Sequence, residues 1–189
     1  NLQLALVNAG SGYYEHPTQA LLDALTIKQH FGRFAGLKVT IVGDISHSRV
    51  ARSNKLLLEK LGAEVAFSGP EAFYPLDLPD CRWVDFNQAV AESDVVMMLR
   101  VQHERHQERF DVSDYNRHFG LDSVKLAQMK ENAIILHPGP VNRSVEITDE
   151  VLKDPRCKIL QQVSNGVAVR MAVLEWCLQE DRCEQLVSA

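Results

Sequence analysis

Several features are missing from this chain of 189 residues, and each absence removes a class of function. No apolar run approaches the roughly 20 residues that cross a bilayer, and the first residues do not resemble a signal peptide. The 20 Lys and Arg residues are outnumbered by 25 Asp and Glu, whereas a surface that binds nucleic acid is usually basic. We therefore expect no membrane partner, no nucleic-acid partner and a cytoplasmic location.

Paired cysteines are also missing. The four cysteines form no C-x-x-C pair and have no spacing typical of metal ligands; they are Cys81, Cys157, Cys177 and Cys183. The run HERH at residues 103–106 differs from the zinc motif H-E-x-x-H. We predict idle thiols in a reducing compartment and no metal site.

The composition that remains is that of an ordinary globular protein, with 46% hydrophobic residues, 24% charged residues and a net charge of −5. The length suits one domain, residues 1–189. Apolar runs alternate with helical segments, which predicts an α/β fold: a three-layer open parallel sheet with helices on both faces, Rossmann-like. The first apolar run has no lead-in, as in a chain that begins in the middle of something.

The apolar runs predict strands at residues 4–7, 38–42, 64–67, 82–85, 95–99 and 133–136, and the helical spacing predicts helices at 17–31, 49–61 and 166–178. Pro17 suits the first helical position, because its missing N–H needs no partner there. The polar segment between Val101 and Phe119 is a candidate mobile active-site loop.

The turn GDISHSR at residues 43–49 joins a predicted strand to a predicted helix. A dinucleotide-binding turn would carry G-x-G-x-x-G there, and its absence disfavours a nucleotide cofactor. Arg49 lies instead near a helix N-terminus, where backbone N–H groups already favour an anion. Taken alone, a solvated surface arginine is the stronger interpretation.

Arg100 follows the predicted strand 95–99 within the sequence LRVQ, at the edge where an open parallel sheet gathers ligand-binding groups. Its planar guanidinium can clamp a carboxylate through two hydrogen bonds, which lysine does less well. The alternative is an ion pair with a neighbouring acid such as Glu104, and the residue alone favours neither interpretation.

His16 and Gln19 lie in the sequence HPTQ at the start of the first predicted helix. A neutral imidazole can donate a hydrogen bond to a carbonyl oxygen on which negative charge develops. A lone histidine is more often structural, although Gly10 and Gly12 just before this one favour a site. The turn HPGP at 137–140 has two prolines that fix φ and leave backbone carbonyls as acceptors; by itself it indicates only a tight turn.

Together these motifs closely resemble the aspartate-binding domain of the aspartate carbamoyltransferase catalytic chain. The similarity runs through essentially the whole sequence, in NAGSGYYEHPTQALLD, GDISHSRVARSN, DVVMMLRVQHERH, HPGPVNRSVEI and SNGVAVRMAVL. The related ornithine enzyme would instead show an S-M-G loop and an H-C-L-P turn, and this sequence has neither. Ser11 replaces the usual Asp of the N-A-G-D-G turn, a change that we expect to alter only local hydrogen bonding.

The resemblance implies a site for carbamoyl phosphate. His16 would polarise its carbonyl oxygen, and Gln19 would hold its amide end. The backbone carbonyls of Gly139 and Pro140 would accept hydrogen bonds from the carbamoyl group and from the amine of the second substrate.

The resemblance also implies that the second substrate is L-aspartate. Arg49 would bind its α-carboxylate, and Arg100 with Gln102 would bind its side-chain carboxylate. The reaction would give N-carbamoyl-L-aspartate and phosphate for pyrimidine synthesis, and no metal or organic cofactor is implied.

The family's catalytic chain has a preceding domain with an S-T-R-T phosphate-binding loop, a motif that occurs nowhere in these residues. In the family's homotrimer a neighbouring subunit adds a serine and a lysine from that domain. The resemblance therefore implies that this chain is the aspartate-binding part, inactive alone. Its last helix, at about residues 166–180, would pack on the preceding domain through the stripe formed by Val167, Met171, Leu174 and Leu178.

Two other classes of function stay open at the level of the sequence. One is a stand-alone module that binds dicarboxylates or amino acids without catalysis. The other is a nucleotide-binding domain, which the missing glycine fingerprint disfavours. An S-T-R-T motif upstream of Asn1 would favour the enzyme.

Overall fold

A computed structural model describes residues 5–12, 14–78, 80–101 and 112–178. Its elements in chain order are α1 (Pro17–Phe31), β1 (Lys38–Val42), α2 (Arg49–Lys60), β2 (Glu64–Ser68), the 3-10 helix η1 (Glu71–Phe73), α3 (Phe86–Glu92), β3 (Val95–Met98), α4 (Val112–Phe119), α5 (Ser123–Gln128), β4 (Ile134–Leu136), α6 (Asp149–Leu152) and α7 (Ile159–Leu178).

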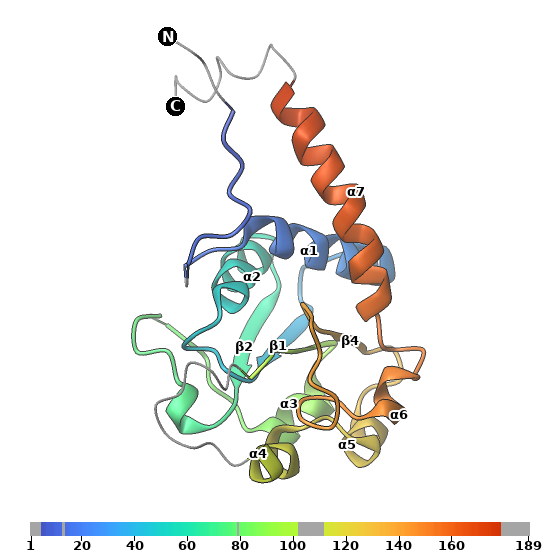
Figure 1. The fold of residues 1–189 in the computed structure, drawn as a ribbon. Coiled ribbons are helices and arrows are strands. Elements are labelled where there is room, and N and C mark those ends of the chain that lie inside the picture. Colours follow the sequence, from blue (N-terminus) through green and yellow to red (C-terminus); the bar gives the residue numbers. More distant parts are fainter. Residues whose placement is uncertain (1–4, 13, 79, 102–111, 179–189) are drawn as a thin grey trace.

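The strands within these described ranges form one parallel sheet in the order β2-β1-β3-β4. Helices α1, α2 and α7 lie on one side of the sheet, and α3 to α6 lie on the other (Figure 1). The predicted three-layer α/β fold is confirmed. The chain passes from β1 through α2 to the edge strand β2, and then returns to place β3 on the other side of β1.

The core follows from the two-residue period of a strand, in which successive side chains point to opposite faces. Val95 and Met97 of β3 pack in the cluster formed with α1 and α2, whereas Val96 and Met98 pack in the cluster formed with α3. All four side chains are fully buried. Burial on both faces explains why this strand is a continuous apolar run in the sequence.

The predicted helix boundaries at the first two helices are confirmed within one residue. Pro17 is the first residue of α1, and Gly32 ends it in the left-handed conformation with φ +69°, its N–H donating to Lys28 O at 2.9 Å. Ser48 caps α2 by accepting a hydrogen bond from the N–H of Ala51 at 3.2 Å.

Two predicted strands are wrong. Residues 5–7 of the run at 4–7 form no strand, and Leu6 is 95% exposed, because no described strand lies beside them to supply ladder hydrogen bonds and cover the side chains. In the run 82–85 only Trp83 forms a bridge, to Phe67. That segment turns away early because Asp85 caps α3, accepting hydrogen bonds from the two N–H groups that follow Phe86.

The predicted loop from Val101 to Phe119 is also corrected in part. Its last eight residues form α4, and Tyr115 within that helix is buried, which pulls this end of the segment into the fold. Residues 102–111 lie outside the described part, so the prediction of a mobile loop stays a prediction there.

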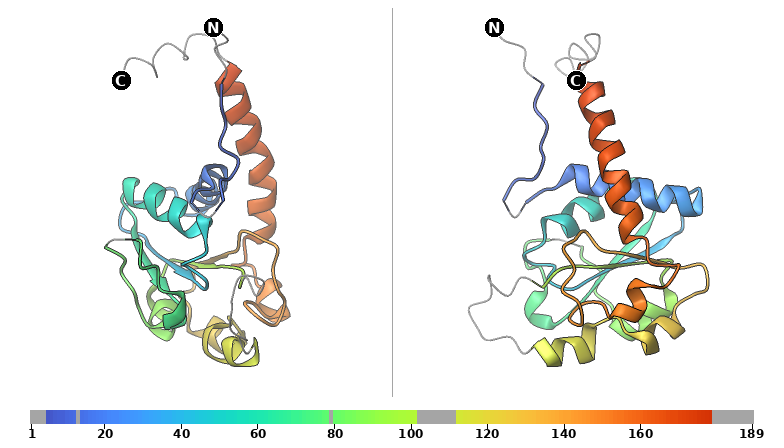
Figure 2. Two further views of the ribbon diagram at one scale, coloured as in Figure 1. Left: turned by 60° about the vertical axis from the view of Figure 1, so that its left-hand side comes forward. Right: turned by 45° about the vertical axis from the view of Figure 1, so that its right-hand side comes forward.

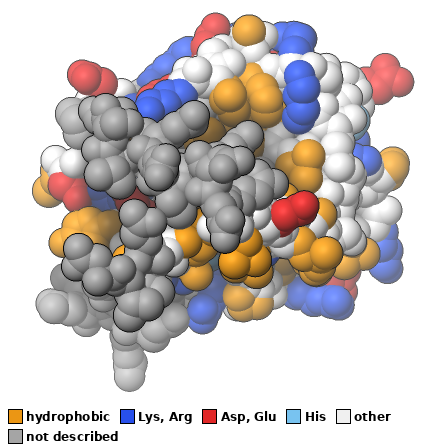
Figure 3. Space-filling view, turned by 90° about the horizontal axis from the view of Figure 1, so that it is seen from above, with side chains coloured by type: hydrophobic (Ala, Val, Ile, Leu, Met, Phe, Trp, Pro, Cys, Tyr) orange, Lys and Arg blue, Asp and Glu red, His pale blue; other side chains and the backbone are white. Residues whose placement is uncertain are grey.

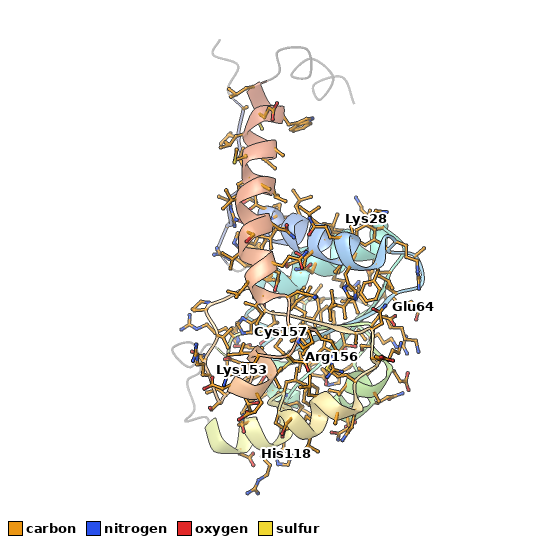
Figure 4. The ribbon with its side chains drawn as sticks, turned by 90° about the vertical axis from the view of Figure 1, so that its right-hand side faces the viewer. Lys28, Glu64, His118, Lys153, Arg156 and Cys157 are labelled. Atoms are coloured by element: carbon orange, nitrogen blue, oxygen red, sulfur yellow. The ribbon has the colours of Figure 1, made fainter. Side chains whose placement is uncertain are left out.

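Helix α7 begins seven residues earlier than predicted, at Ile159. Its first half packs against α1, where Gln162, Asn165 and Gly166 are buried. Its second half projects beyond α1 (Figures 1 and 2). The predicted apolar stripe is exposed, by 57% to 81% at its four positions: Val167, Met171, Leu174 and Leu178. Figure 4 shows these upper turns extending beyond the other helices and the strands.

The view from above that end of the molecule shows hydrophobic side chains gathered on one surface (Figure 3). No described helix combines the length and the apolar character needed to cross a membrane. Cys81, Cys157 and Cys177 are free thiols that are partly buried, and Cys183 lies outside the described residues.

Candidate functional site

A pocket of about 330 Å³ opens where the carboxyl ends of β1 and β3 lie side by side. The chain leaves these two neighbouring strands in opposite directions along the sheet, which makes this edge the switch point where open α/β sheets bind ligands. The pocket is lined by Gly12, His16, Gln19, His47, Ser48, Arg49, Val50, Leu99, Arg100, Pro138, Gly139 and Pro140.

Arg49 reaches the pocket as the first residue of α2. Its guanidinium lies against the backbone of Gly10, where a Cβ would stand only 2.8 Å from Nη1 and 3.0 Å from Cζ. Gly10 has φ +133°, a conformation that favours glycine. The turn at residues 8–10 therefore lets the Arg49 guanidinium lie directly against its backbone. The N-terminus of α2 and the guanidinium of Arg49 both border the pocket.

Arg100 enters the pocket directly after β3. The backbone on either side of it is fixed, because Leu99 N–H donates to Val42 O at 2.8 Å and Val101 N–H donates to Glu146 Oε1 at 2.9 Å. Glu146 is completely buried. Arg49 and Arg100 thus come from two adjacent strand ends, and both line the pocket.

His16 precedes α1 and contributes an imidazole. The backbone N–H of His16 donates to Ser53 Oγ at 2.9 Å, and Thr18 Oγ1 lies 3.5 Å from the ring nitrogen Nδ1. Burial lowers the pKa of His16 below its ordinary value, and the positive charges of Arg49 and Arg170 lower it further. The neutral ring that the sequence suggested is therefore the favoured form at neutral pH.

Gln19 lies one turn further along α1 and is buried, with its Nε2 donating to Asp23 Oδ1 at 2.9 Å. Asp23 also accepts hydrogen bonds from Asn54 Nδ2 at 2.8 Å and from Gln162 Nε2 at 2.7 Å. Complete burial raises the pKa of Asp23 to about 6, although the three amide donors act in the opposite direction.

The turn at 137–140 is held from the inside. His137 is buried. Its backbone N–H donates to Gln162 Oε1 at 2.9 Å, and its ring nitrogen Nδ1 accepts from the backbone N–H of Gly139 at 2.9 Å. Its Nε2 lies 3.6 Å from Glu146 Oε2. The same Glu146 carboxylate therefore contacts the turn and the strand end that carries Arg100.

Sequence reasoning missed His47, which lines the pocket two residues before Arg49. Its Nδ1 lies 2.8 Å from Oδ1 of the fully buried Asp44, and Ser46 Oγ lies 3.1 Å from the same ring nitrogen. Its place in the turn after β1 was the available signal, since that turn had already drawn attention to Arg49.

The structure brings six of the seven predicted site residues to this one pocket; these are His16, Gln19, Arg49, Arg100, Gly139 and Pro140. Gln102 lies outside the described residues. Among the residues that the structure describes, no group of three or more His, Cys, Asp or Glu side chains could hold a metal ion.

Comparisons with known proteins identify the family of this chain. A family model for the aspartate/ornithine carbamoyltransferase Asp/Orn binding domain matches residues 35–177. The aspartate carbamoyltransferase catalytic subunit of Listeria welshimeri is 51% identical over 183 residues, which are 95% of this chain and 60% of that protein. The Salinispora tropica catalytic subunit is 52% identical over 178 residues, with coverage of 90% and 58%.

The solved structures give the same picture. Aspartate transcarbamoylase from Trypanosoma cruzi, in complex with carbamoyl aspartate and phosphate, matches with a TM-score of 0.79 at 29% identity. The match covers 88% of this chain and 57% of that one. The chain therefore spans 60% or less of the length of each of these relatives. On this family match and these identities, the chain belongs to the aspartate/ornithine carbamoyltransferase family and contains its Asp/Orn binding domain.

Proposed function

We propose that this chain is the aspartate-binding part of an aspartate carbamoyltransferase. The amine nitrogen of L-aspartate attacks the carbonyl carbon of carbamoyl phosphate. The new C–N bond forms, the C–O bond to phosphate breaks, and the amine gives up a proton. The products are N-carbamoyl-L-aspartate and phosphate, an early step of pyrimidine synthesis in the cytoplasm.

The observation that carries the proposal is the pair of arginines from adjacent strand ends in one pocket. A dicarboxylate has two anionic ends, and two separated guanidinium groups can bind both through charge-assisted hydrogen bonds. Arg49, beside a helix N-terminus, takes the α-carboxylate. Arg100, with Gln102, takes the side-chain carboxylate, which favours aspartate over ornithine because the side chain of ornithine carries a positive charge.

The remaining lining residues suit the carbamoyl group. If Thr18 Oγ1 donates to His16 Nδ1, the proton of the ring lies on Nε2, and this N–H can stabilise the carbonyl oxygen as negative charge develops. The lowered pKa of His16 keeps the ring a neutral donor. Gln19 holds the amide end, and the carbonyls of Gly139 and Pro140 accept from the carbamoyl and amino groups.

The phosphate of the donor calls for a second domain. It is a dianion and needs its own N–H groups and cations, whereas both arginines of the pocket are assigned to aspartate. The exposed stripe of α7 is an apolar surface of the kind that a further domain covers. We propose that a carbamoyl-phosphate domain packs there, and that a homotrimer completes the site as in the family.

Activity of the purified chain tests this proposal. Without phosphate binding, the reactants lose the positioning that makes the attack effectively unimolecular, an advantage on the order of 7–11 kcal/mol at its fullest. We expect no carbamoyl-aspartate above the uncatalysed background, and formation of carbamoyl-aspartate when a carbamoyl-phosphate domain is supplied in trans. This mixture is called the reconstituted enzyme below.

Two results would contradict the proposal. Turnover by the isolated chain near that of an ordinary enzyme, roughly 10 per second, would show that no second domain is needed. Tight binding of aspartate with no turnover in the reconstituted enzyme would favour the alternative, a dicarboxylate-binding module without catalysis.

A further inference from the structure

Asp23 is a buried carboxylate directly behind a residue that lines the pocket. It accepts hydrogen bonds from three side-chain amides, each on a different helix: Gln19 on α1, Asn54 on α2 and Gln162 on α7. The donor–acceptor distances are 2.9, 2.8 and 2.7 Å. A fully buried carboxylate with three such donors is an acceptor in a fixed position.

This environment decides which way the Gln19 amide faces. A side-chain amide has donor hydrogens on one side and an acceptor oxygen on the other, whereas an ionised carboxylate can only accept. Gln19 must therefore turn its Nε2 toward Asp23. Its Oε1 points the other way, and no donor among the described residues is bonded to that oxygen, although Gln19 lines the pocket.

We propose that Asp23 is a positioning residue that holds the oxygen of Gln19 ready to accept a hydrogen bond from the NH2 group of the carbamoyl donor. This inference rests on the proposed function and adds a basis for selectivity to it. A pocket with a fixed acceptor favours a donor molecule that carries N–H at this position over one that carries a methyl group.

The same network reaches the second acceptor of the pocket. Gln162 Nε2 donates to Asp23, and its Oε1 accepts from His137 N–H at 2.9 Å. His137 Nδ1 in turn accepts from Gly139 N–H at 2.9 Å. One continuous set of hydrogen bonds therefore fixes both Gln19 and the turn at 137–140, which lines the pocket.

A purely structural role for Asp23 makes a different prediction. If Asp23 only joins three helices, its loss loosens the whole pocket and weakens the binding of every ligand in parallel. If it orients Gln19, its loss weakens the binding of N–H donors selectively. Carbamoyl phosphate and acetyl phosphate separate the two cases, because they differ only by NH2 against CH3 at this position.

The test uses D23L in the reconstituted enzyme. Leu has no acceptor oxygen, whereas Asn would still offer its Oδ1 to Gln19 Nε2, so only with Leu does the Gln19 amide lose its reason to turn its oxygen toward the pocket. We expect the dissociation constant of carbamoyl phosphate to rise roughly tenfold or more, since a polar group that was built to pair is left unpaired. That of acetyl phosphate, measured by competition, should change less than about twofold.

N54A is the matched control, because it removes one donor from the same carboxylate and leaves the bond between Gln19 and Asp23 in place. It should lower stability and preserve the ratio of the two dissociation constants. An unchanged ratio in D23L, or an equal loss of the ratio in N54A, would overturn the inference. Absence of carbamoyl-phosphate binding in the wild type would instead refute the proposed function.

A second measurement needs no variant. In the isotope-labelled chain, the side-chain NH2 protons of Gln19 should exchange with solvent at least about tenfold more slowly than those of the exposed Gln128. Equal exchange rates would show that Gln19 does not donate to Asp23, and this result would overturn the inference whether or not D23L folds.

Discussion

Replacing Gly10 with alanine should damage aspartate recognition without adding a side chain to the ligand-binding face. A Cβ at this position would stand 2.8 Å from Arg49 Nη1 and 3.0 Å from Cζ, whereas ordinary contacts begin at 3.4 Å. The guanidinium must therefore retreat by about 0.6 Å. It can do so cheaply, because it is the end of a flexible side chain, so Arg49 moves and the fold survives.

The size of the effect follows from that displacement. A misplacement on the order of 1 Å can cost a factor of 10² in rate, so a shift of about half that size should cost roughly tenfold, or about 1.4 kcal/mol, in kcat/KM for aspartate. The Michaelis constant of carbamoyl phosphate should stay within about twofold, because Arg49 does not contact it in our assignment. Steady-state kinetics of the reconstituted enzyme measure both constants.

Gly32→Ala is the control for backbone strain. Gly32 also has a positive φ, +69°, but a Cβ there meets nothing within 4 Å, and it ends α1 on the exposed surface. Both variants should lose about 1–2 kcal/mol of stability, and only Gly10→Ala should lose affinity for aspartate. Equal aspartate kinetics in the two variants would refute the placement of Arg49 against Gly10.

Three further outcomes are expected. Arg100→Ala should cost about 2–4 kcal/mol of transition-state stabilisation with aspartate and less with an analogue that lacks the side-chain carboxylate; equal losses would remove Arg100 from that role. Because the pKa of Asp23 is raised to about 6, the free energy of unfolding of the wild type relative to Asp23→Asn should increase by about 2 kcal/mol as the pH falls from 7 to 4, and a difference in unfolding free energy that does not change across this range would contradict it. In hydrogen exchange, α7 should be well protected at residues 159–166 and poorly protected at 170–178, where its stripe is exposed; strong protection throughout would mean that another part of the protein covers the stripe.

The sign of that pH effect follows from the raised pKa. Above pH 6 the folded chain holds an ionised carboxylate away from water, which the unfolded chain does not have to do. Between about pH 4 and pH 6 the folded state binds a proton that the unfolded state releases, so stability is gained on acidification and lost as the pH rises through 6. The Asn side chain does not titrate and removes this contribution.

The sheet was largely predictable because each of its strands is buried on both faces. Such strands appear as short apolar runs, and β1 was predicted with the boundaries that the structure shows. The run at 82–85 has apolar residues only at its two central positions; Asp85 caps α3 and only Trp83 pairs with a strand. Local composition does not by itself predict strand pairing, because pairing depends on the neighbouring strand.

The site residues were predictable where they lie within short sequence motifs. HPTQ, GDISHSR and LRVQ each follow a strand or start a helix, and topology then brings their side chains to one edge of the sheet. The chemistry that supports these motifs was not visible in the same way. Asp44 and Glu146 are fully buried acids whose partners are set by the fold.

Asp23 shows why such support escapes the sequence. It lies between Leu22 and Ala24 in the sequence, and an acidic residue in a helix is ordinarily predicted to be exposed to solvent. Its three partners are residues 19, 54 and 162, and only the packing of α1 against both α2 and α7 brings them together. Burying the carboxylate raises its pKa and disfavours its charged form, so the network is better explained by what it positions than by what it stabilises.

The two halves of α7 therefore have different functions in the fold. The first half turns Gln162 and Asn165 inward, where Gln162 joins Asp23 to His137 and Asn165 donates to Thr26 Oγ1 at 2.9 Å. The second half presents the exposed apolar stripe. In the proposed enzyme the outer half of α7 packs on a carbamoyl-phosphate domain, and the inner half fixes Gln19 and the turn at 137–140. One rigid helix would then connect the packing of the two domains to the residues that bind the carbamoyl and amino groups.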